Sequence, residues 1–265
     1  MDHARRNPLS APLNAESKVG HDSTTTHVCI QMRAGILAIQ DANPYDVDAY
    51  VNYWHHSGQE IKKLLGIDQE KLGNPQDSRE RFLKMIRVPG IYQANVIFSI
   101  SLNNRVIGYT NVNRHGPDEN YIHLHTYRSA IRSTLRAQQS DPSRNIKTGA
   151  GVAGVVIGLM MDMYLRLFPV RRLVLQTKPE NRWINRALDL YLLPVVTKYV
   201  DRPAGLAAPG VLHLRYVGRT EATWMLRRAK FLSIGQADCQ VIDTTHGRLA
   251  PTNDPEKDQA VNTFA

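Results

Sequence analysis

The chain has 265 residues, enough for one sizeable domain or two small ones. Hydrophobic residues make up 42% and charged residues 22% of it, proportions that are ordinary for a globular protein. The net charge of +9 favours polyanionic partners, but the basic residues are spread along the chain. A generally basic surface is therefore the simpler interpretation, and nucleic acid is an unlikely partner.

Two further features narrow the class of protein. Cys29 and Cys239 lie far apart and give neither a metal-binding spacing nor a disulfide framework, so we expect no metal and a reducing, cytoplasmic setting. The most apolar segment, Val152–Phe168, carries Asp162 and Arg166 and is short for a membrane span. It is expected to be a buried helix, and the protein is not expected to bind a membrane.

Both ends of the chain are polar and lack hydrophobic periodicity. Residues 1–27 are rich in Ser, Thr, Asn and Pro and are expected to form a disordered arm. Residues 233–265 are expected to form a flexible polar tail. The folded domain should then cover residues 28–232.

The first part of this domain alternates between strand and helix patterns. Val28–Ile39 is typical of a strand, and a helix is expected from Asp46, as its cap, to His55. Gln59–Leu65 and Ser78–Ile86 are predicted to be further short helices. A hairpin follows over 94–111, with Asn103-Asn104 at its turn.

A third antiparallel strand is predicted over Tyr121–Tyr127. His123 and His125 are two residues apart on it, so their side chains share one face of the sheet. A base that removes a proton from an amine must work near neutral pH, where histidine titrates. The two histidines are candidate bases, although polar residues on the outer face of a sheet would give the same pattern.

The most informative stretch runs from Thr148 to Tyr191. It contains a glycine turn over Thr148–Gly154, an apolar helix, a strand over Arg172–Thr177 and a second helix from Asn181. A glycine turn that opens a helix suits an anion, because the backbone can approach a phosphate closely and free N–H groups point at it. A tight turn without a ligand remains the alternative.

This order of parts resembles the acetyl-CoA-binding core of the GNAT (GCN5-related N-acetyltransferase) superfamily. The family's pyrophosphate loop, Gln/Arg-x-x-Gly-x-Gly/Ala, is matched at Gly151 and Ala153, with Thr148 in the place of Gln/Arg. Its later helix commonly has the pattern Asn-x-x-Ala-x-x-Leu/Phe-Tyr. Ala187, Leu190 and Tyr191 fit this pattern, whereas Ile184 stands in the place of the Asn, which follows as Asn185, and Leu193-Pro194 replaces the usual Gly-Phe.

The resemblance implies an α/β fold with a mixed, mostly antiparallel sheet, flanking helices and a splayed central strand pair. It implies transfer of an acetyl group from acetyl-CoA to an amine. His123 and His125 resemble the His-x-His of the arylalkylamine N-acetyltransferases, and Tyr191 would be the general acid that protonates the departing thiolate. The residues expected to bind the cofactor are Thr126, Tyr127, Thr148, Gly149, Ala150, Gly151, Val152, Ala153, Gly154, Asn181 and Asn185.

Other interpretations stay open. Asn181 and Asn185 could cap a helix instead of binding pantetheine. Basic residues in the segment 128–147 could reach the phosphates of CoA or only face solvent. The remaining residues are expected to form a Pro/Ala/Gly-rich link over 194–210 and a closing hairpin of Val211–Val217 with Ala222–Arg228. The fold could serve a non-catalytic module that binds CoA or another nucleotide, the chain could form a homodimer, and the amine acceptor is not identified.

Overall fold

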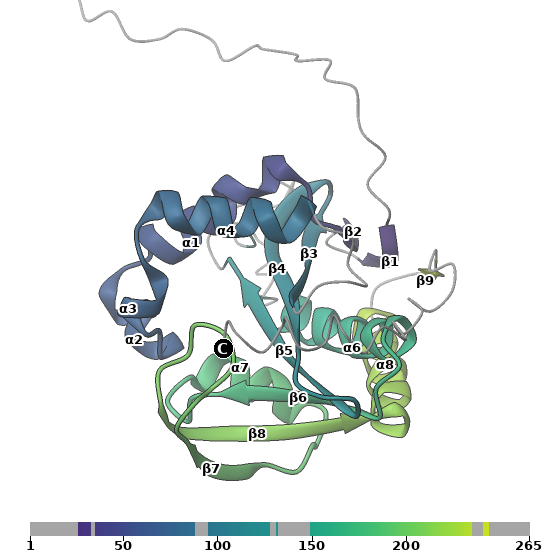
Figure 1. Ribbon diagram of the computed structural model, residues 1–265. Helices are drawn as coiled ribbons and strands as arrows, with labels where there is room; N and C mark the ends of the chain where they lie inside the picture. Colours follow the sequence, from purple (N-terminus) through teal and green to yellow (C-terminus); the bar gives the residue numbers. More distant parts are fainter. Residues whose placement is uncertain are drawn as a thin grey trace, which may run out of the picture.

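A computed structural model describes residues 26–32, 35–87, 95–127, 131, 149–234 and 241–243. Its centre is one twisted sheet whose described strands follow the order β7-β8-β6-β5-β4-β3-β2-β1-β9 (Figure 1). The strands are β1 Thr26–Met32, β2 Gly35–Asp41, β3 Asn95–Leu102, β4 Arg105–Arg114, β5 Glu119–Thr126, β6 Arg172–Thr177, β7 Val196–Val200, β8 Gly210–Gly218 and β9 Val241–Asp243.

Helices cover both faces of this sheet. They are the short 3-10 helix η1 Pro44–Asp46 and the α-helices α1 Val47–His56, α2 Gln59–Leu65, α3 Gln69–Leu72, α4 Pro75–Arg87, α6 Gly149–Leu167, α7 Arg182–Asp189 and α8 Arg219–Ile234.

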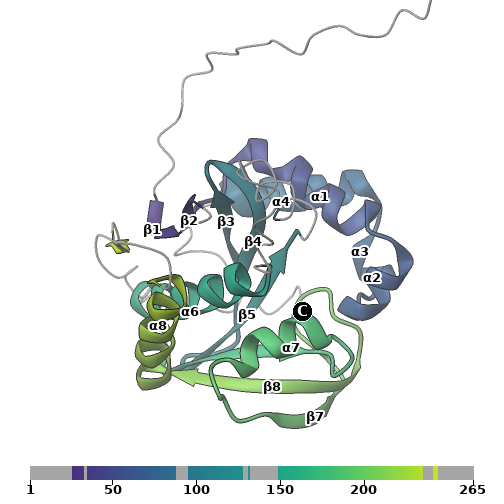
Figure 2. The same ribbon diagram turned by 180° about the vertical axis from the view of Figure 1, so that it is seen from behind.

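The alternating side chains of the strands build two separate cores. On one face, Phe98 and Ile122 pack with the apolar helix α6 and with residues of α7 and α8. Figure 2 shows these three helices on the same side of the sheet. On the other face, α1 and α4 pack through Tyr50, Trp54 and Phe82 against Ile97, Tyr109 and Tyr127. The second core is rich in aromatic residues, and the His face of β5 belongs to this side.

The centre of the sheet opens between β5 and β6. These two strands pair in parallel from Glu119 with Arg172 to Ile122 with Leu175, and the pairing then stops. The rest of β5 remains paired with β4, and the rest of β6 remains paired with β8. The expected splayed pair is therefore confirmed, and Figure 1 shows the two strands spreading apart beside α2 and α3.

The expected closing hairpin is wrong. Val211–Val217 lies in β8, but residues 222–228 lie in helix α8, and the antiparallel partners of β8 are β6 and β7. Ala222, Met225 and Ala229 are buried at helical spacing, and α8 packs against α6 through them. The segment 194–210, expected to be only a link, contributes the edge strand β7.

The boundaries of the domain also differ from the expectation. Thr26 and His27 already belong to β1, although they were assigned to the arm, and α8 continues to Ile234. Three residues of the expected tail form β9 and pair with Val28–Ile30 of β1. An apolar Val-Ile pair at 241–242 is what distinguishes this short strand from its polar surroundings. Residues 1–25, 33–34, 88–94, 128–130, 132–148, 235–240 and 244–265 lie outside the described residues.

Among the described residues, no helix is long and apolar enough to cross a membrane. The described part of the chain also contains no group of three or more His, Cys, Asp and Glu side chains that could hold a metal ion.

Candidate functional site

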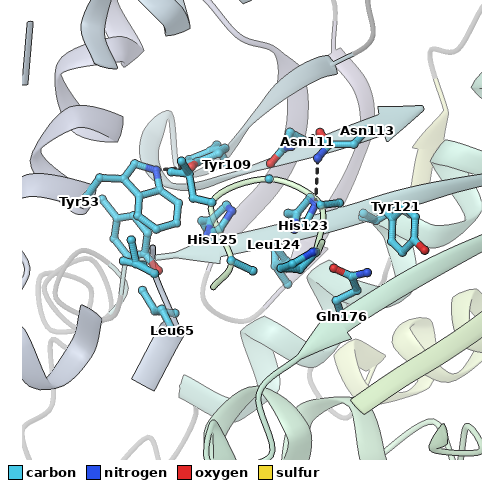
Figure 3. A pocket seen from close by; sticks show the side chains of 18 of the residues that line it. Tyr53, Leu65, Tyr109, Asn111, Asn113, Tyr121, His123, Leu124, His125 and Gln176 are labelled. Carbon is cyan, nitrogen blue, oxygen red and sulfur yellow. Dashed lines mark hydrogen bonds between the residues drawn. The ribbon is translucent and has the colours of Figure 1, made fainter. Parts of the chain in front are cut away.

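A large pocket lies on the aromatic side of the sheet, at the splayed strands. It is lined by residues of β4, β5 and β6, by helices α1 to α4 and by the loop 201–209 (Figure 3). His123 and His125 both point into it from β5. Thr126, Tyr127 and Asn181, which were predicted to bind the cofactor, line the same pocket.

The register of the β4–β5 hairpin decides which residues surround the two histidines. Tyr109 lies opposite His125, and Asn111 lies opposite His123. Cross-strand pairs have closely spaced side chains, so β4 places one aromatic ring and one amide directly beside the histidine pair. The two imidazole rings are stacked, with their centroids 6.4 Å apart.

Aromatic rings enclose His125. The centroid of its imidazole lies 4.6 Å from that of Tyr109, 4.7 Å from Trp54 and 5.8 Å from Tyr53. Trp54 donates its indole N–H to the hydroxyl of Tyr109, which fixes both rings. Tyr127 stacks on Tyr53 at 5.0 Å. Among the described residues, the hydroxyl of Tyr127 and Nδ1 of His125 are buried without a hydrogen-bond partner, whereas Nε2 of His125 is not among these enclosed atoms.

His123 is held by a chain of two amides. Asn111 donates from Nδ2 to Oδ1 of Asn113 at 2.9 Å, and Asn113 donates from Nδ2 to Nε2 of His123 at 3.1 Å. Since an amide N–H cannot accept, Nε2 of His123 is the acceptor and the imidazole is in its neutral form, with its proton on Nδ1. Burial lowers the pKa of His123 to about 4. Burial, followed by the neighbouring charge of His123, lowers the pKa of His125 well below its usual value.

A backbone bridge closes the pocket over His123. Asp68 N–H donates to the carbonyl of Leu206 at 2.9 Å, and Ala208 N–H donates to the carbonyl of Gly66 at 2.7 Å. The bridge thus ties the turn between α2 and α3 to the loop between β7 and β8. A Cβ atom on Gly205 would lie 3.4 Å from the imidazole of His123, so this loop contacts the histidine directly.

The glycine-rich segment begins helix α6 instead of forming a separate turn. Gly149, Ala150 and Gly151 are already helical, and Val152 and Ala153 are buried in the core. Gly154 is helical as well. The first N–H groups of a helix have no partner within it, so the anion-binding property assigned to a glycine turn applies here to the first turn of α6. Thr148 lies outside the described residues.

Asn185 is fully engaged by the fold. Its Oδ1 accepts from Thr177 at 2.8 Å and from the buried guanidinium of Arg215 at 2.9 Å, and its Nδ2 donates to the carbonyl of Lys178 at 2.9 Å. Arg215 is 2% exposed and also pairs with Asp189 at 2.7 Å. Asn181, in contrast, is the residue before α7 and makes no side-chain capping bond. Of the two predicted asparagines, only Asn181 has its amide available to the pocket.

Tyr191 lies apart from the histidine pair. It is 1% exposed and does not line the pocket. Its hydroxyl donates to the carbonyl of Gly154 in α6, and its ring packs edge-on against Trp224 at 6.1 Å. Burial raises its pKa. The structure brings His123, His125, Thr126, Tyr127 and Asn181 together in one pocket but places Tyr191 on the opposite side of the sheet, in the core of α6, α7 and α8.

Sequence reasoning missed several residues of the site. Asn111, Asn113 and Tyr109 alternate along β4, and the hairpin register would have placed them beside the histidines. Tyr53 and Trp54 lie within the helix predicted from Asp46 to His55, and that prediction alone gives them no part in the site. The bridge to the loop 201–209 joins segments that are distant in sequence, and no local pattern signals it.

The order of the strands and the splayed pair define the fold of the chain. The chain has the fold of the GNAT acetyltransferases. It is similar to RimJ of Mycobacterium smegmatis, which was solved with CoA-disulfide. The sequence identity is 15%, the match covers 76% of this chain and 93% of that chain, and the TM-score is 0.56. It is also similar to the spermidine N-acetyltransferase of Vibrio cholerae, which was solved with CoA and spermine. Here the sequence identity is 10%, the match covers 71% of this chain and 98% of that chain, and the TM-score is 0.50.

A third solved structure, from Salmonella typhimurium, is an acetyltransferase that modifies the N-terminal serine of the ribosomal protein L7/L12. Its identity to this chain is 14%, with 71% of this chain and 98% of that chain covered and a TM-score of 0.50. No protein-family model matches the chain, and no curated protein matches its sequence. The likeness is therefore one of fold.

Proposed function

We propose that the protein transfers the acetyl group of acetyl-CoA to an amine. The observation that carries this proposal is the opening between β5 and β6, because it places unpaired strand edges next to two histidines in one pocket. An extended amide chain such as pantetheine can pair with such an edge in the manner of a strand. The solved structures with this fold include complexes with CoA, which supports the same ligand here.

The first turn of α6 would hold the pyrophosphate of the cofactor. Its N–H groups and the helix dipole favour an anion, and Gly149 and Gly151 have no side chains that would keep the phosphates away. Thr126, Tyr127 and Asn181 would contact the thioester end of the cofactor, since they line the pocket beside the open strand edges.

In the reaction, the amine nitrogen attacks the thioester carbonyl carbon, so that a C–N bond forms and the C–S bond breaks. His125 would take the proton that the nitrogen loses, at Nε2, directly or through water. The CoA thiolate leaves and takes up a proton. Tyr127 is a donor for that proton with its hydroxyl unpaired in the pocket, whereas Tyr191 would first have to release the carbonyl of Gly154.

The proposal is tested by calorimetric titration of acetyl-CoA into the wild type, Gly151→Asp and Gly151→Ala. An aspartate in the first turn favours the helix but repels phosphate, so we expect a folded variant that has lost at least tenfold in affinity. Gly151→Ala adds a methyl group without charge and should bind more tightly than Gly151→Asp. If the wild-type protein does not bind acetyl-CoA even at millimolar concentrations of the cofactor, the proposal is refuted. Binding without transfer to any amine would instead favour the non-catalytic CoA-binding module.

A further inference from the structure

Resting on the proposed acetyl transfer, we infer that the acceptor is a neutral, weakly basic amine attached to a flat ring, and not a polyamine. The inference rests on three properties of the pocket: the charge of its whole lining, the hydrogen-bonding state of its histidines, and the aromatic rings around His125.

The lining of the pocket is positively charged. Seven of its described side chains are lysine or arginine, whereas two are acidic, Asp68 and Asp201. Asp68 is already paired with Lys71 at 3.7 Å. A polyamine carries several positive charges and needs carboxylates to bind, so this lining repels it. An acceptor that is neutral at its nitrogen, or that carries an acidic group elsewhere, suits the same lining.

The groups that face the histidine pair keep it neutral. They are the phenols of Tyr53, Tyr109 and Tyr127, the indole of Trp54 and the amides of Asn111 and Asn113, and no described carboxylate is among them. Nε2 of His123 is occupied by an N–H donor and cannot take a proton unless Asn113 turns its amide. Nδ1 of His125 is enclosed by the protein, so Nε2, which is not among the enclosed atoms, is the nitrogen that remains for the acceptor.

Because burial lowers the pKa of both histidines, neither is basic enough to take a proton readily from an alkylammonium ion, whose pKa is about 10. An amine that arrives unprotonated avoids this step. Its N–H group can donate to Nε2 of His125, and its proton needs to leave only after attack on the thioester has made the nitrogen acidic. Aromatic amines are neutral at pH 7 and meet this condition.

The walls of the acceptor site favour a flat group beside the reacting nitrogen. The rings of Tyr53, Trp54 and Tyr109 surround His125, and rings of this kind stack on planar apolar groups. The bridge between 66–68 and 206–208 covers the site beside His123. The charge of the pocket lining, the neutral state of the two histidines and the aromatic walls thus favour the same acceptor, a neutral amine attached to a flat ring.

The test compares two acceptors, 4-aminobenzoate and spermidine, at pH 7.5 with the full chain. Acetyl-CoA binding is first measured by calorimetry without an acceptor, and kcat/KM is then measured for each amine. We expect kcat/KM for 4-aminobenzoate to exceed that for spermidine at least a hundredfold. Preference for spermidine, or no transfer to 4-aminobenzoate by a protein that binds acetyl-CoA, would overturn this inference alone. Absence of acetyl-CoA binding would overturn the proposed function together with it.

A variant series tests the role of charge directly. Asn113→Asp places a carboxylate beside His123, which raises the pKa of the histidine and gives an ammonium group a partner. It should reduce the preference for 4-aminobenzoate at least tenfold, and Asn111→Asp, opposite His123 in the hairpin, should act in the same direction. Gln69→Glu makes the same change of charge on the exposed start of α3, outside the pocket, and should leave the preference unaltered. Folded Asp variants that keep the wild-type preference would overturn the inference.

Discussion

Replacing Asn185 with alanine distinguishes a structural role from a cofactor-binding role for this residue. The side chain joins the end of β6, the start of α7 and the buried guanidinium of Arg215 through three hydrogen bonds of 2.8 to 2.9 Å. Alanine removes these three bonds and a longer one of 3.4 Å to the carbonyl of Pro179, and it leaves Nη1 of Arg215 without its partner, while the bond from Arg215 to Asp189 remains. The substitution therefore leaves a buried charged group incompletely paired.

The expected loss of stability follows from these contacts. A neutral hydrogen bond contributes about 1 kcal/mol and one to a charged group about 2 kcal/mol, so the free energy of unfolding should fall by about 3 to 4 kcal/mol. The change corresponds to a fall in melting temperature of roughly 6 to 16 °C for a domain of this size. Urea unfolding followed by circular dichroism measures it, and Asn181→Ala, which removes no capping bond, should cost less than about 0.5 kcal/mol.

The same variants are then titrated with acetyl-CoA. If Asn185 is structural, the folded Asn185→Ala protein binds the cofactor as the wild type does, whereas Asn181→Ala binds it more weakly. A stable Asn185→Ala variant whose cofactor affinity has fallen tenfold or more would refute the reasoning and return Asn185 to the cofactor site.

Three further predictions follow from the site and its supports. The pKa of His123 is about 4 in the folded state and about 6.5 in the unfolded state, so the unfolded state binds more protons between these two pH values. The free energy of unfolding should therefore fall by up to about 3 kcal/mol as the pH drops through this window. Urea titrations at pH 7 and pH 4 measure the fall, which should be smaller for His123→Gln. Gly108→Ala would bring a Cβ atom to 2.2 Å from the carbonyl oxygen of His125, so it should lower the melting temperature and weaken acetyl transfer together, whereas Gly58→Ala, where a Cβ atom meets nothing within 4 Å, should leave the melting temperature unchanged. Tyr191→Phe removes the bond to Gly154 and should cost about 1 kcal/mol in urea unfolding; a large fall in kcat with unchanged affinity for acetyl-CoA would instead support Tyr191 as the general acid.

The strands and helices with strong local patterns were predictable from the sequence. The hairpin of β3 and β4 has a clear turn and alternating apolar residues, and α6 is apolar on nearly every side, so both follow from periodicity alone. The prediction of a strand over residues 222–228 is wrong because a short alternation of apolar residues resembles a strand pattern, although Ala222, Met225 and Ala229 have helical spacing.

The candidate site was predictable only in part. The placement of His123 and His125 on one face follows from the period of a strand, and this placement is confirmed. Their neutral state depends on Asn113, and the roles of Asn185 and Tyr191 depend on contacts with Arg215 and Gly154, which are distant in sequence. Such contacts form only when the helices and strands pack together, so no local pattern in a single sequence predicts them.

The pairing of β9 with β1 has a consequence for how the chain acquires its structure. Val28–Ile30 form an outer strand of the sheet until residues 241–243 arrive beside them. During synthesis from the N-terminus, that strand must therefore wait for nearly the whole chain, with its backbone donors and acceptors open to other molecules. We expect a chain shortened after α8 to keep the helices and the pocket but to expose a strand edge to self-association. In that case the last strand would protect the chain against aggregation, at a place far from the proposed chemistry.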